Sequence, residues 1–161
     1  MGFRDVFIGL GSNLGNPQRQ LSLALDSLDA IRDIELTNIS KFYRNPPLGQ
    51  LDQPYYVNAV AQIETSLDVE ALFFLMQKIE VKQGRPTNRK KWSSRLIDLD
   101  LLVYGEETIN SETLKIPHPG IKCRAFVLLP LAEIAPSLIV PGLGRVKDLL
   151  QGIDGSSLIQ L

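Results

Sequence analysis

Several residue types are scarce in this chain of 161 residues, and each scarcity excludes something. Cysteine occurs once, as Cys123, so an internal disulfide cannot form, which is the pattern of a reducing compartment. Acidic and basic side chains nearly cancel and leave a formal net charge of −1. The chain as a whole is therefore not a polyelectrolyte ligand for nucleic acid or a membrane surface, and any charge-driven binding must come from a local patch.

Long hydrophobic runs are also missing. No apolar run approaches the roughly 18 residues of a membrane-spanning helix. The N-terminal stretch becomes acidic at Asp5, too early for a secretory signal, and Val6 stands where a myristoylation signal has serine or threonine. We therefore expect a cytoplasmic protein without a membrane partner.

The composition is that of a globular protein, with 44% hydrophobic and 22% charged residues. A chain of this length supports one domain with its own hydrophobic core. No internal repeat, low-complexity tract or linker divides the sequence, so we expect a single domain over residues 1–161.

Hydrophobic patterns predict elements in the order strand–helix–strand–strand–helix–strand. The predicted strands are Arg4–Leu10, Glu35–Arg44, Tyr55–Glu64 and Leu96–Tyr104, and the predicted helices begin at Asn16-Pro17 and span Asp68–Gln83. This order is that of an α+β ferredoxin-like fold, an antiparallel sheet with helices on one face. The C-terminal additions include two short predicted helices, Phe126–Ile134 interrupted by Pro130 and Val146–Leu150.

Two acidic residues share one face of the last predicted strand. Side chains alternate along a strand, so Asp98 and Asp100 point the same way. The apolar residues between and around them point to the helices: Ile97, Leu99, Leu101 and Val103. Neighbouring carboxylates repel each other unless a cation lies between them, and oxygen ligands at this spacing suit magnesium. Because Asp-x-Asp is a common pattern, a solvent-facing pair of acids is the alternative.

A cationic stretch precedes the acidic pair. Between Glu80 and Asp98 there are six basic residues and no acid: Lys82, Arg85, Arg89, Lys90, Lys91 and Arg95. Such a run by itself is more often a solvated loop or a weak nucleic-acid patch. Its position beside a metal-type pair favours a polyphosphate ligand, because arginine binds phosphate oxygens bidentately. Trp92 within the stretch offers a ring that can stack on a planar ligand.

The single histidine and the glycine-rich loop are the remaining candidates. A lone histidine is more often structural than catalytic, but prolines and nearby cations around His118 favour a contact with phosphate. Glycines 9, 11 and 15 do not have the dinucleotide-binding spacing, and no P-loop motif occurs. We expect Gly9–Asn13 to bring the backbone close to a ligand.

Together these segments resemble the 6-hydroxymethyl-7,8-dihydropterin pyrophosphokinase family of folate biosynthesis. The resemblance covers nearly all of residues 6–143. It rests on these segments, in this order: Gly9–Leu14, Phe42–Gly49, Asp52–Asn58, Glu80–Arg85, Arg95-x-x-Asp98-Leu-Asp100, Ile116-Pro-His118 and Arg124-x-Phe126.

The resemblance implies a transferase that moves pyrophosphate from ATP to a pterin alcohol and releases AMP. Asp98 and Asp100 would hold two magnesium ions and, with Arg85 and Arg95, would form the catalytic set. The residues implied at the ATP site are Gln77, Glu80, Arg85, Trp92, Arg95, Leu101, His118 and Arg124. Those implied at the pterin site are Asn45, Pro46, Leu48, Tyr56, Asn58 and Phe126, with the ring between Tyr56 and Phe126.

Some positions depart from the family pattern. Asn45 stands where threonine is frequent, and Thr87 where some members carry a second arginine. Thr113, Lys115 and Pro119 replace the basic or aromatic residues expected around His118. The resemblance further implies small-molecule substrates and a monomer.

Two alternatives remain at this point. One is a related metal-dependent nucleotidyl or phosphoryl transferase with another acceptor. The other is a ferredoxin-like RNA- or effector-binding module, against which stand the missing aromatic RNA-recognition motif and the exposed acidic pair.

Overall fold

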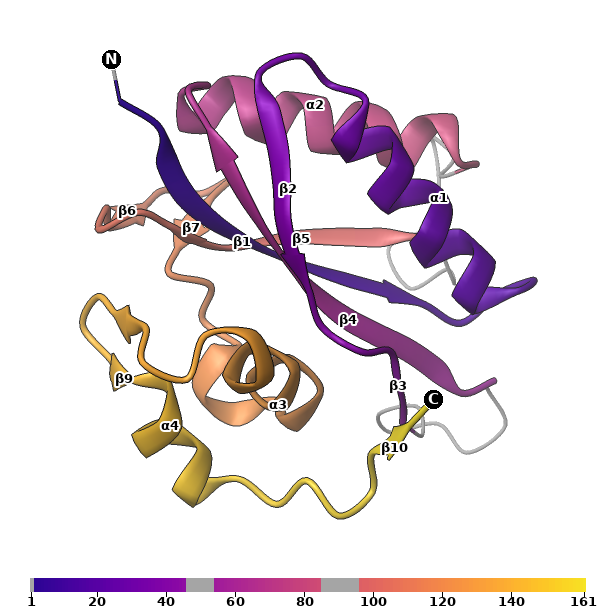
Figure 1. The fold of residues 1–161 in the computed structure, drawn as a ribbon, viewed down its shortest axis with the longest axis vertical. Coiled ribbons are helices and arrows are strands. Elements are labelled where there is room, and N and C mark those ends of the chain that lie inside the picture. The colour runs from indigo at the N-terminus through magenta and orange to yellow at the C-terminus, as the bar shows by residue number, and fades with distance from the viewer. Residues whose placement is uncertain (1, 46–53, 85–95) are drawn as a thin grey trace.

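A computed structural model describes residues 2–45, 54–84 and 96–161. Its centre is an antiparallel sheet in which β1 (Arg4–Ser12) lies between β4 (Tyr56–Thr65) and β5 (Asp98–Tyr104). Two helices, α1 (Pro17–Asp29) and α2 (Val69–Lys82), lie on one face of the sheet, and α3 (Ala125–Ile134) lies on the other (Figure 1). The expected ferredoxin-like α+β fold is confirmed, with α3 as an added third layer.

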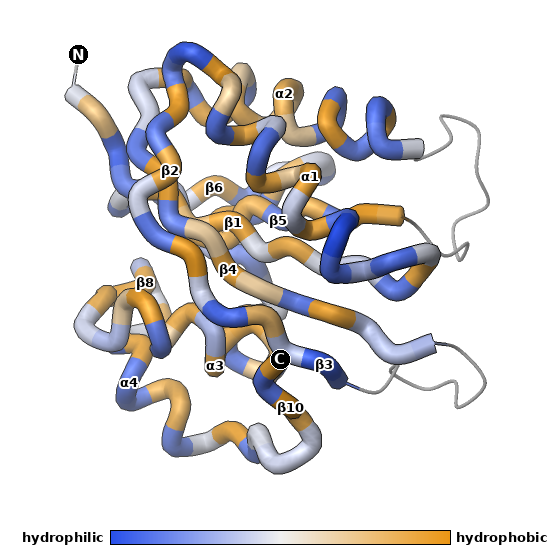
Figure 2. Tube along the Cα trace, turned by 45° about the vertical axis from the view of Figure 1, so that its right-hand side comes forward, coloured by the Kyte–Doolittle hydropathy of each residue, from blue (hydrophilic) through white to orange (hydrophobic). Residues whose placement is uncertain are grey.

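Both covering helices begin where the sequence predicts, and α2 also ends within one residue of its predicted end. Asn16 and Asp68 are the N-caps, and their side chains accept hydrogen bonds from the backbone N–H groups three residues on. Gly84 follows α2 with φ of 109°, a conformation that a side chain would strain. In Figure 2 the colours of α2 alternate between hydrophobic and hydrophilic, as expected for a helix with one buried face.

A hydrophobic core fills each side of the sheet. The first core packs α1 and α2 against the sheet and includes Leu21, Leu72 and Met76. The second packs α3 against the opposite face and includes Leu128 and Leu131. Among the described residues, no helix is long and apolar enough to cross a membrane.

The prediction that Val103 shares the helix-facing side of its strand is wrong. The pairing of β1 with β5 shifts register between Phe7 and Ile8, which pair with Val103 and Leu101 and leave Leu102 as an extra residue. A bulge of this kind reverses the alternation of side chains beyond it. Leu102 and Val103 therefore both lie in the second core, whereas Leu101 lies in the first.

The predicted strand Glu35–Arg44 is two strands, β2 (Ile34–Ile39) and β3 (Tyr43–Asn45), both paired with β4. Ser40 lies in the break. Its backbone N–H donates to the Val60 carbonyl at 2.9 Å, and its hydroxyl accepts from the Val60 N–H at 2.9 Å. A side-chain hydroxyl thus takes the place of a backbone group, so the chain can turn without leaving Val60 unpaired.

The C-terminal segment is shaped by its packing on α3. Pro130 lies inside α3, and the helix continues through it to Ile134 rather than being interrupted as predicted. Beyond α3 come a hairpin, β8 (Ile139–Val140) and β9 (Gly144–Arg145), and the short helix α4 (Val146–Leu149). The last strand, β10 (Ile159–Gln160), pairs with β3, so the C-terminal segment completes the sheet edge beside the candidate site.

The smaller elements lie between β5 and α3. They are the hairpin strands β6 (Ile109–Asn110) and β7 (Lys115–Ile116) and the 3-10 turn η1 (Ile121–Cys123); a second turn, η2 (Leu150–Gly152), follows α4.

Candidate active site

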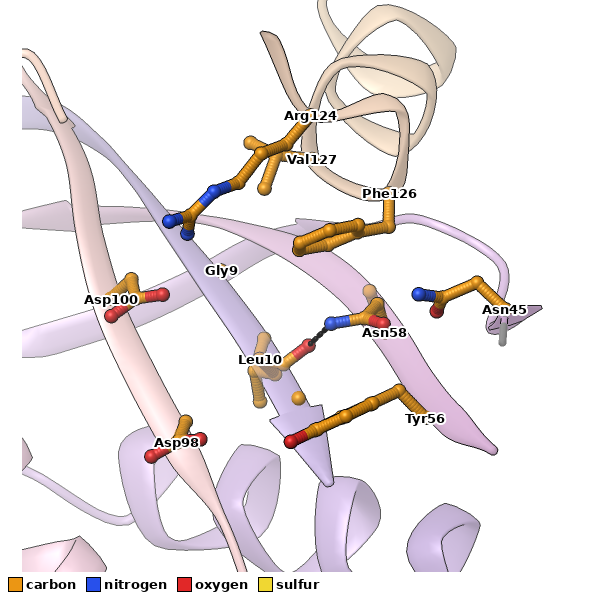
Figure 3. A pocket seen from close by; sticks show the side chains of 12 residues that line it. Gly9, Leu10, Asn45, Tyr56, Asn58, Asp98, Asp100, Arg124, Phe126 and Val127 are labelled. Atoms are coloured by element: carbon orange, nitrogen blue, oxygen red, sulfur yellow. Dashed lines mark hydrogen bonds between the residues drawn. The ribbon is translucent and has the colours of Figure 1, made fainter. Parts of the chain in front are cut away.

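A cavity of about 220 Å³ opens between the sheet and the start of α3 (Figure 3). Strands β1, β3, β4 and β5 supply one side and α3 the other. Its lining residues are Gly9, Leu10, Gly11, Asn45, Tyr56, Asn58, Ala59, Asp98, Asp100, Arg124, Phe126 and Val127.

Four residues expected at the pterin site meet in this first cavity. Tyr56 and Phe126 lie on opposite sides of Asn58, which comes from the same strand as Tyr56 (Figure 3). Asn45 joins them because β3 places it opposite Tyr56 in the strand register. Two aromatic rings with amides between them suit a flat ligand that has a polar edge. The other two expected residues, Pro46 and Leu48, lie outside the described residues.

The Asn58 amide is held in place and keeps an open acceptor. The side chain is 9% exposed, and its Nδ2 donates to the Leu10 carbonyl at 3.5 Å. Its Oδ1 is buried and has no hydrogen-bond partner in the described part of the chain. A buried acceptor left unpaired is unfavourable, so this oxygen is suited to a donor on a ligand. Gly11 makes room for the amide, because a Cβ at Gly11 would lie 2.7 Å from Nδ2.

Asp98 and Asp100 are half-buried on the cavity face of β5, as predicted (Figure 3). In the described part of the chain there is no cluster of three or more histidine, cysteine or acidic side chains that could hold a metal ion. Two carboxylates and no further protein ligand fit magnesium, which typically takes one or two carboxylates and completes its shell with water and phosphate oxygens.

A second cavity, of about 350 Å³, lies on the other side of Asp100. Four of the residues expected at the ATP site line it: Gln77, Glu80, Leu101 and His118. Asp100 lines both cavities, so the carboxylate pair lies where the two meet. Three further expected residues, Arg85, Trp92 and Arg95, lie outside the described residues.

Arg124 differs from the other described residues expected at the ATP site, because it does not line the second cavity. It lines the first cavity, with its guanidinium carbon 5.9 Å from the centre of the Phe126 ring. Figure 3 shows it on the side of the cavity that also holds Asp100. A cation there can reach an anionic group bound beside the carboxylates.

Glu80 of α2 is a buried acidic residue. It is 4% exposed, and its Oε2 accepts the Leu99 backbone N–H at 2.8 Å. β5 is the edge of the sheet on this side, so this carboxylate caps a backbone donor that has no neighbouring strand. Glu80 thereby fixes the strand between Asp98 and Asp100.

His118 is held as a neutral donor. Its Nδ1 accepts the Gly120 backbone N–H at 2.9 Å, which leaves the proton on Nε2. Burial lowers the pKa of the imidazole below its ordinary value; the negative charge of Asp100 opposes this, and the positive charge of Arg124 adds to it. The ring is thus suited to donate a hydrogen bond into the second cavity.

The protonation of His118 can be measured directly, because it is the only histidine. We expect the ¹⁵N spectrum of the ligand-free protein at pH 7 to show the neutral Nε2–H tautomer, with titration below the ordinary pKa of about 6.5. The pKa should rise in Arg124→Gln, because a neighbouring positive charge is removed. A doubly protonated ring at pH 7, or a proton on Nδ1, would contradict this assignment.

The structure adds residues that the resemblance did not name. Gly9 and Gly11 line the first cavity, in agreement with the expected close backbone approach. Phe73 lines the second cavity. The sequence feature that could have indicated it is its position four residues before Gln77, on the same face of α2. Thr113, Lys115 and Pro119, the positions that depart from the family pattern, also line the second cavity. They come from the segment between β6 and η1, which strand and helix patterns do not position.

The fold and site define a ferredoxin-like α+β enzyme with a metal-type carboxylate pair between two ligand cavities. Residues 7–136 match the family described as 7,8-dihydro-6-hydroxymethylpterin-pyrophosphokinase. The chain belongs to this family.

Curated relatives agree over nearly the full length. The Haemophilus influenzae protein named 2-amino-4-hydroxy-6-hydroxymethyldihydropteridine pyrophosphokinase is 43% identical over 156 residues, covering 97% of each chain. The Pseudomonas aeruginosa protein of the same name is 41% identical over 145 residues, covering 90% of this chain and 89% of its own. The family and the enzyme class expected from the sequence are confirmed.

Solved structures agree on the fold. A chain described as HPPK-DHPS in complex with substrates superposes with a TM-score of 0.79 at 12% identity, and it covers all of this chain. A Plasmodium falciparum HPPK-DHPS chain gives a TM-score of 0.73 at 13% identity over 93% of this chain. This chain spans 47% and 45% of those two chains.

Proposed function

We propose that the chain transfers the pyrophosphoryl group of ATP to the hydroxymethyl oxygen of 6-hydroxymethyl-7,8-dihydropterin and releases AMP. The observation that carries this proposal is that Asp100 lines both cavities. An acceptor in the first cavity and a triphosphate in the second would thus meet at the carboxylate pair. The names of the curated relatives supply the identity of the acceptor.

The pterin would occupy the first cavity between Tyr56 and Phe126. The open Oδ1 of Asn58 would accept a hydrogen bond from the pterin's amino or ring N–H group. Asn45, with Pro46 and Leu48, would contribute to the far edge of the ring. The hydroxymethyl group would then point toward Asp98 and Asp100.

ATP would occupy the second cavity, beside Gln77, Leu101 and His118. The Nε2–H of His118 would donate to a phosphate oxygen. Glu80, which also lines this cavity, would hold β5 in position through its hydrogen bond to the Leu99 backbone N–H. Arg85, Trp92, Arg95 and Arg124 would complete the site, with the arginines neutralising phosphate charge.

Asp98 and Asp100 would hold the magnesium, as two ions. When bound, the metal neutralises charge on the polyphosphate and on the oxygens that change charge during transfer.

The reaction is an in-line substitution at the β-phosphorus. A bond forms from the hydroxymethyl oxygen to this phosphorus, the bond from it to the oxygen bridging to the α-phosphorus breaks, and AMP leaves with that oxygen. The hydroxyl proton would pass to the carboxylate of Asp98 or Asp100, both of which line the first cavity. Phosphoryl-type transfer depends on positioning and charge neutralisation, which the two adjoining cavities and the basic residues provide.

The proposal also includes a monomer that acts on small molecules in a reducing cytoplasm.

The decisive experiment is AMP formation from ATP with and without 6-hydroxymethyl-7,8-dihydropterin. We expect AMP to appear only with the pterin, to stop when magnesium is chelated, and to return when magnesium is restored in excess. Pterin-independent AMP, or none from the folded protein, would overturn the proposal. A pterin-independent result would favour a transferase with another acceptor.

A further inference from the structure

Two opposite walls of the first cavity are tied together by one carboxylate. Glu133 of α3 accepts a hydrogen bond from the Tyr43 hydroxyl at 2.6 Å. The same carboxylate accepts the Lys41 backbone N–H, at 3.0 Å to one oxygen and 3.2 Å to the other. Hydrogen bonds to an ionised acceptor are stronger than neutral ones, so these bonds join α3 firmly to the chain that enters β3.

Both ends of this link lead directly to cavity residues. On α3, Glu133 follows Phe126 by seven residues, which places the two on nearly the same helix face and about 10 Å apart along the axis. On the sheet, Tyr43 lies two residues before Asn45 and therefore on the same face of β3. The strand register also sets Tyr43 opposite Asn58. The residues of the link are thus direct neighbours of the residues that line the cavity.

The break in the neighbouring strand directs a backbone donor toward α3. The chain leaves the regular sheet between β2 and β3, where the Lys41 N–H points to α3 instead of to another strand. Lys41 and Glu133 are both exposed, so without Glu133 this donor would bond to water and the link from α3 to the chain that enters β3 would be lost. Burial, and then the hydrogen bond and negative charge of Glu133, raise the pKa of Tyr43 to about 12, so the hydroxyl remains a donor throughout the physiological range.

We propose that Glu133, through Tyr43 and Lys41, is a positioning residue that sets the separation between α3 and β3, and with it the fit of the first cavity to a flat ligand. This inference rests on the proposed function, because the ligand whose binding it controls is the pterin. Glu133 is not among the described residues that line the first or the second cavity, so its effect on binding is indirect.

The test uses three variants: Tyr43→Phe, Glu133→Ala and the double variant that combines them. Each is compared with a control variant, Tyr104→Phe. The control removes a tyrosine hydroxyl that donates to the Leu67 carbonyl, away from both cavities. We expect the KM for the pterin to rise about tenfold in each single variant, because small misplacements of binding groups carry large penalties. The KM for ATP should remain within about twofold of the wild-type value. The double variant should have a KM for the pterin similar to that of each single variant, because the two substitutions break the same link.

Tyr104→Phe should leave both KM values unchanged even where it lowers the melting temperature. Equal rises in the KM for pterin and for ATP, or a lower melting temperature with both KM values unchanged, would overturn the proposal and leave Glu133 with a purely structural role.

A second measurement needs no catalysis and keeps the two proposals separate. Hydrogen exchange of the β3 amides, residues 43–45, should accelerate in Tyr43→Phe and Glu133→Ala and stay at the wild-type rate in Tyr104→Phe. If the wild type makes no AMP but β3 exchange responds in this way, the pterin assignment fails and the link between α3 and β3 stands. If β3 exchange is unchanged in both variants, the link fails whatever the activity.

Discussion

Asp98→Asn and Asp100→Asn should each reduce pterin-dependent AMP formation by about a thousandfold or more. Neutralising one carboxylate removes half of the charge with which the described chain attracts a divalent cation between the two cavities, and such a cation contributes several kcal/mol to a transition state of this kind. Pterin binding in the absence of magnesium should change little, because the ring is held by Asn58 and two aromatic side chains on other elements. The measurements are steady-state AMP formation and pterin titration by fluorescence.

The matched control for this pair is Glu107→Gln, an exposed acid just beyond the end of β5. It changes the net charge by the same amount and lines neither cavity, so it should keep full activity. If Asp98→Asn or Asp100→Asn kept even a tenth of the wild-type rate at saturating magnesium, the carboxylate pair would not be the metal site.

Asn58→Ala should lower kcat/KM for the pterin by at least about a hundredfold and leave the KM for ATP nearly unchanged. The substitution removes the buried Oδ1, which has no partner among the described residues, so a pterin donor would enter the cavity unpaired. Asn38→Ala, at an exposed position on β2 in the same sheet, is the control. A mild effect of Asn58→Ala would favour a transferase with a different acceptor.

Gly11→Ala tests the same contact without changing the amide. The added Cβ would lie 2.7 Å from Asn58 Nδ2, so the amide must turn away and we expect the KM for the pterin to rise. Gly9→Ala, one pleat away on the same strand, is the comparison. The three atoms nearest to its Cβ would be Leu102 side-chain atoms at 3.5 to 3.7 Å, which is ordinary contact. An equal loss in both variants would show that cavity volume, rather than the orientation of Asn58, limits binding.

Local patterns were sufficient for the elements that carry the site. The asparagine–proline start of α1, the Asp68 cap of α2 and the strand alternation around Asp98 and Asp100 all depend on neighbours within a few residues. Backbone dihedrals and helical or strand periods act at that range, so the sequence could predict them. The family resemblance added the pterin and ATP residues, and all of those within the described segments line one of the two cavities. Arg124, implied at the ATP site, lines the first cavity rather than the second.

Long-range contacts account for the errors. Val103 faces the second core because β1 and β5 pair through a bulge, and the break between β2 and β3 is filled by Ser40 against Val60. The burial of Glu80 depends on Leu99, 19 positions away, whose backbone N–H its carboxylate accepts. Glu133 and Tyr43 are 90 positions apart, and neither carries a motif.

The sequence by itself therefore determined the family, the sheet and its two covering helices, and the acidic pair, because each is encoded by residues close together in the chain. The tertiary structure decided which side chains share a cavity, which buried polar atoms find partners and how α3 is held against β3. Those outcomes depend on the register between strands and on packing across the sheet, where a shift of one residue moves a side chain to the opposite face.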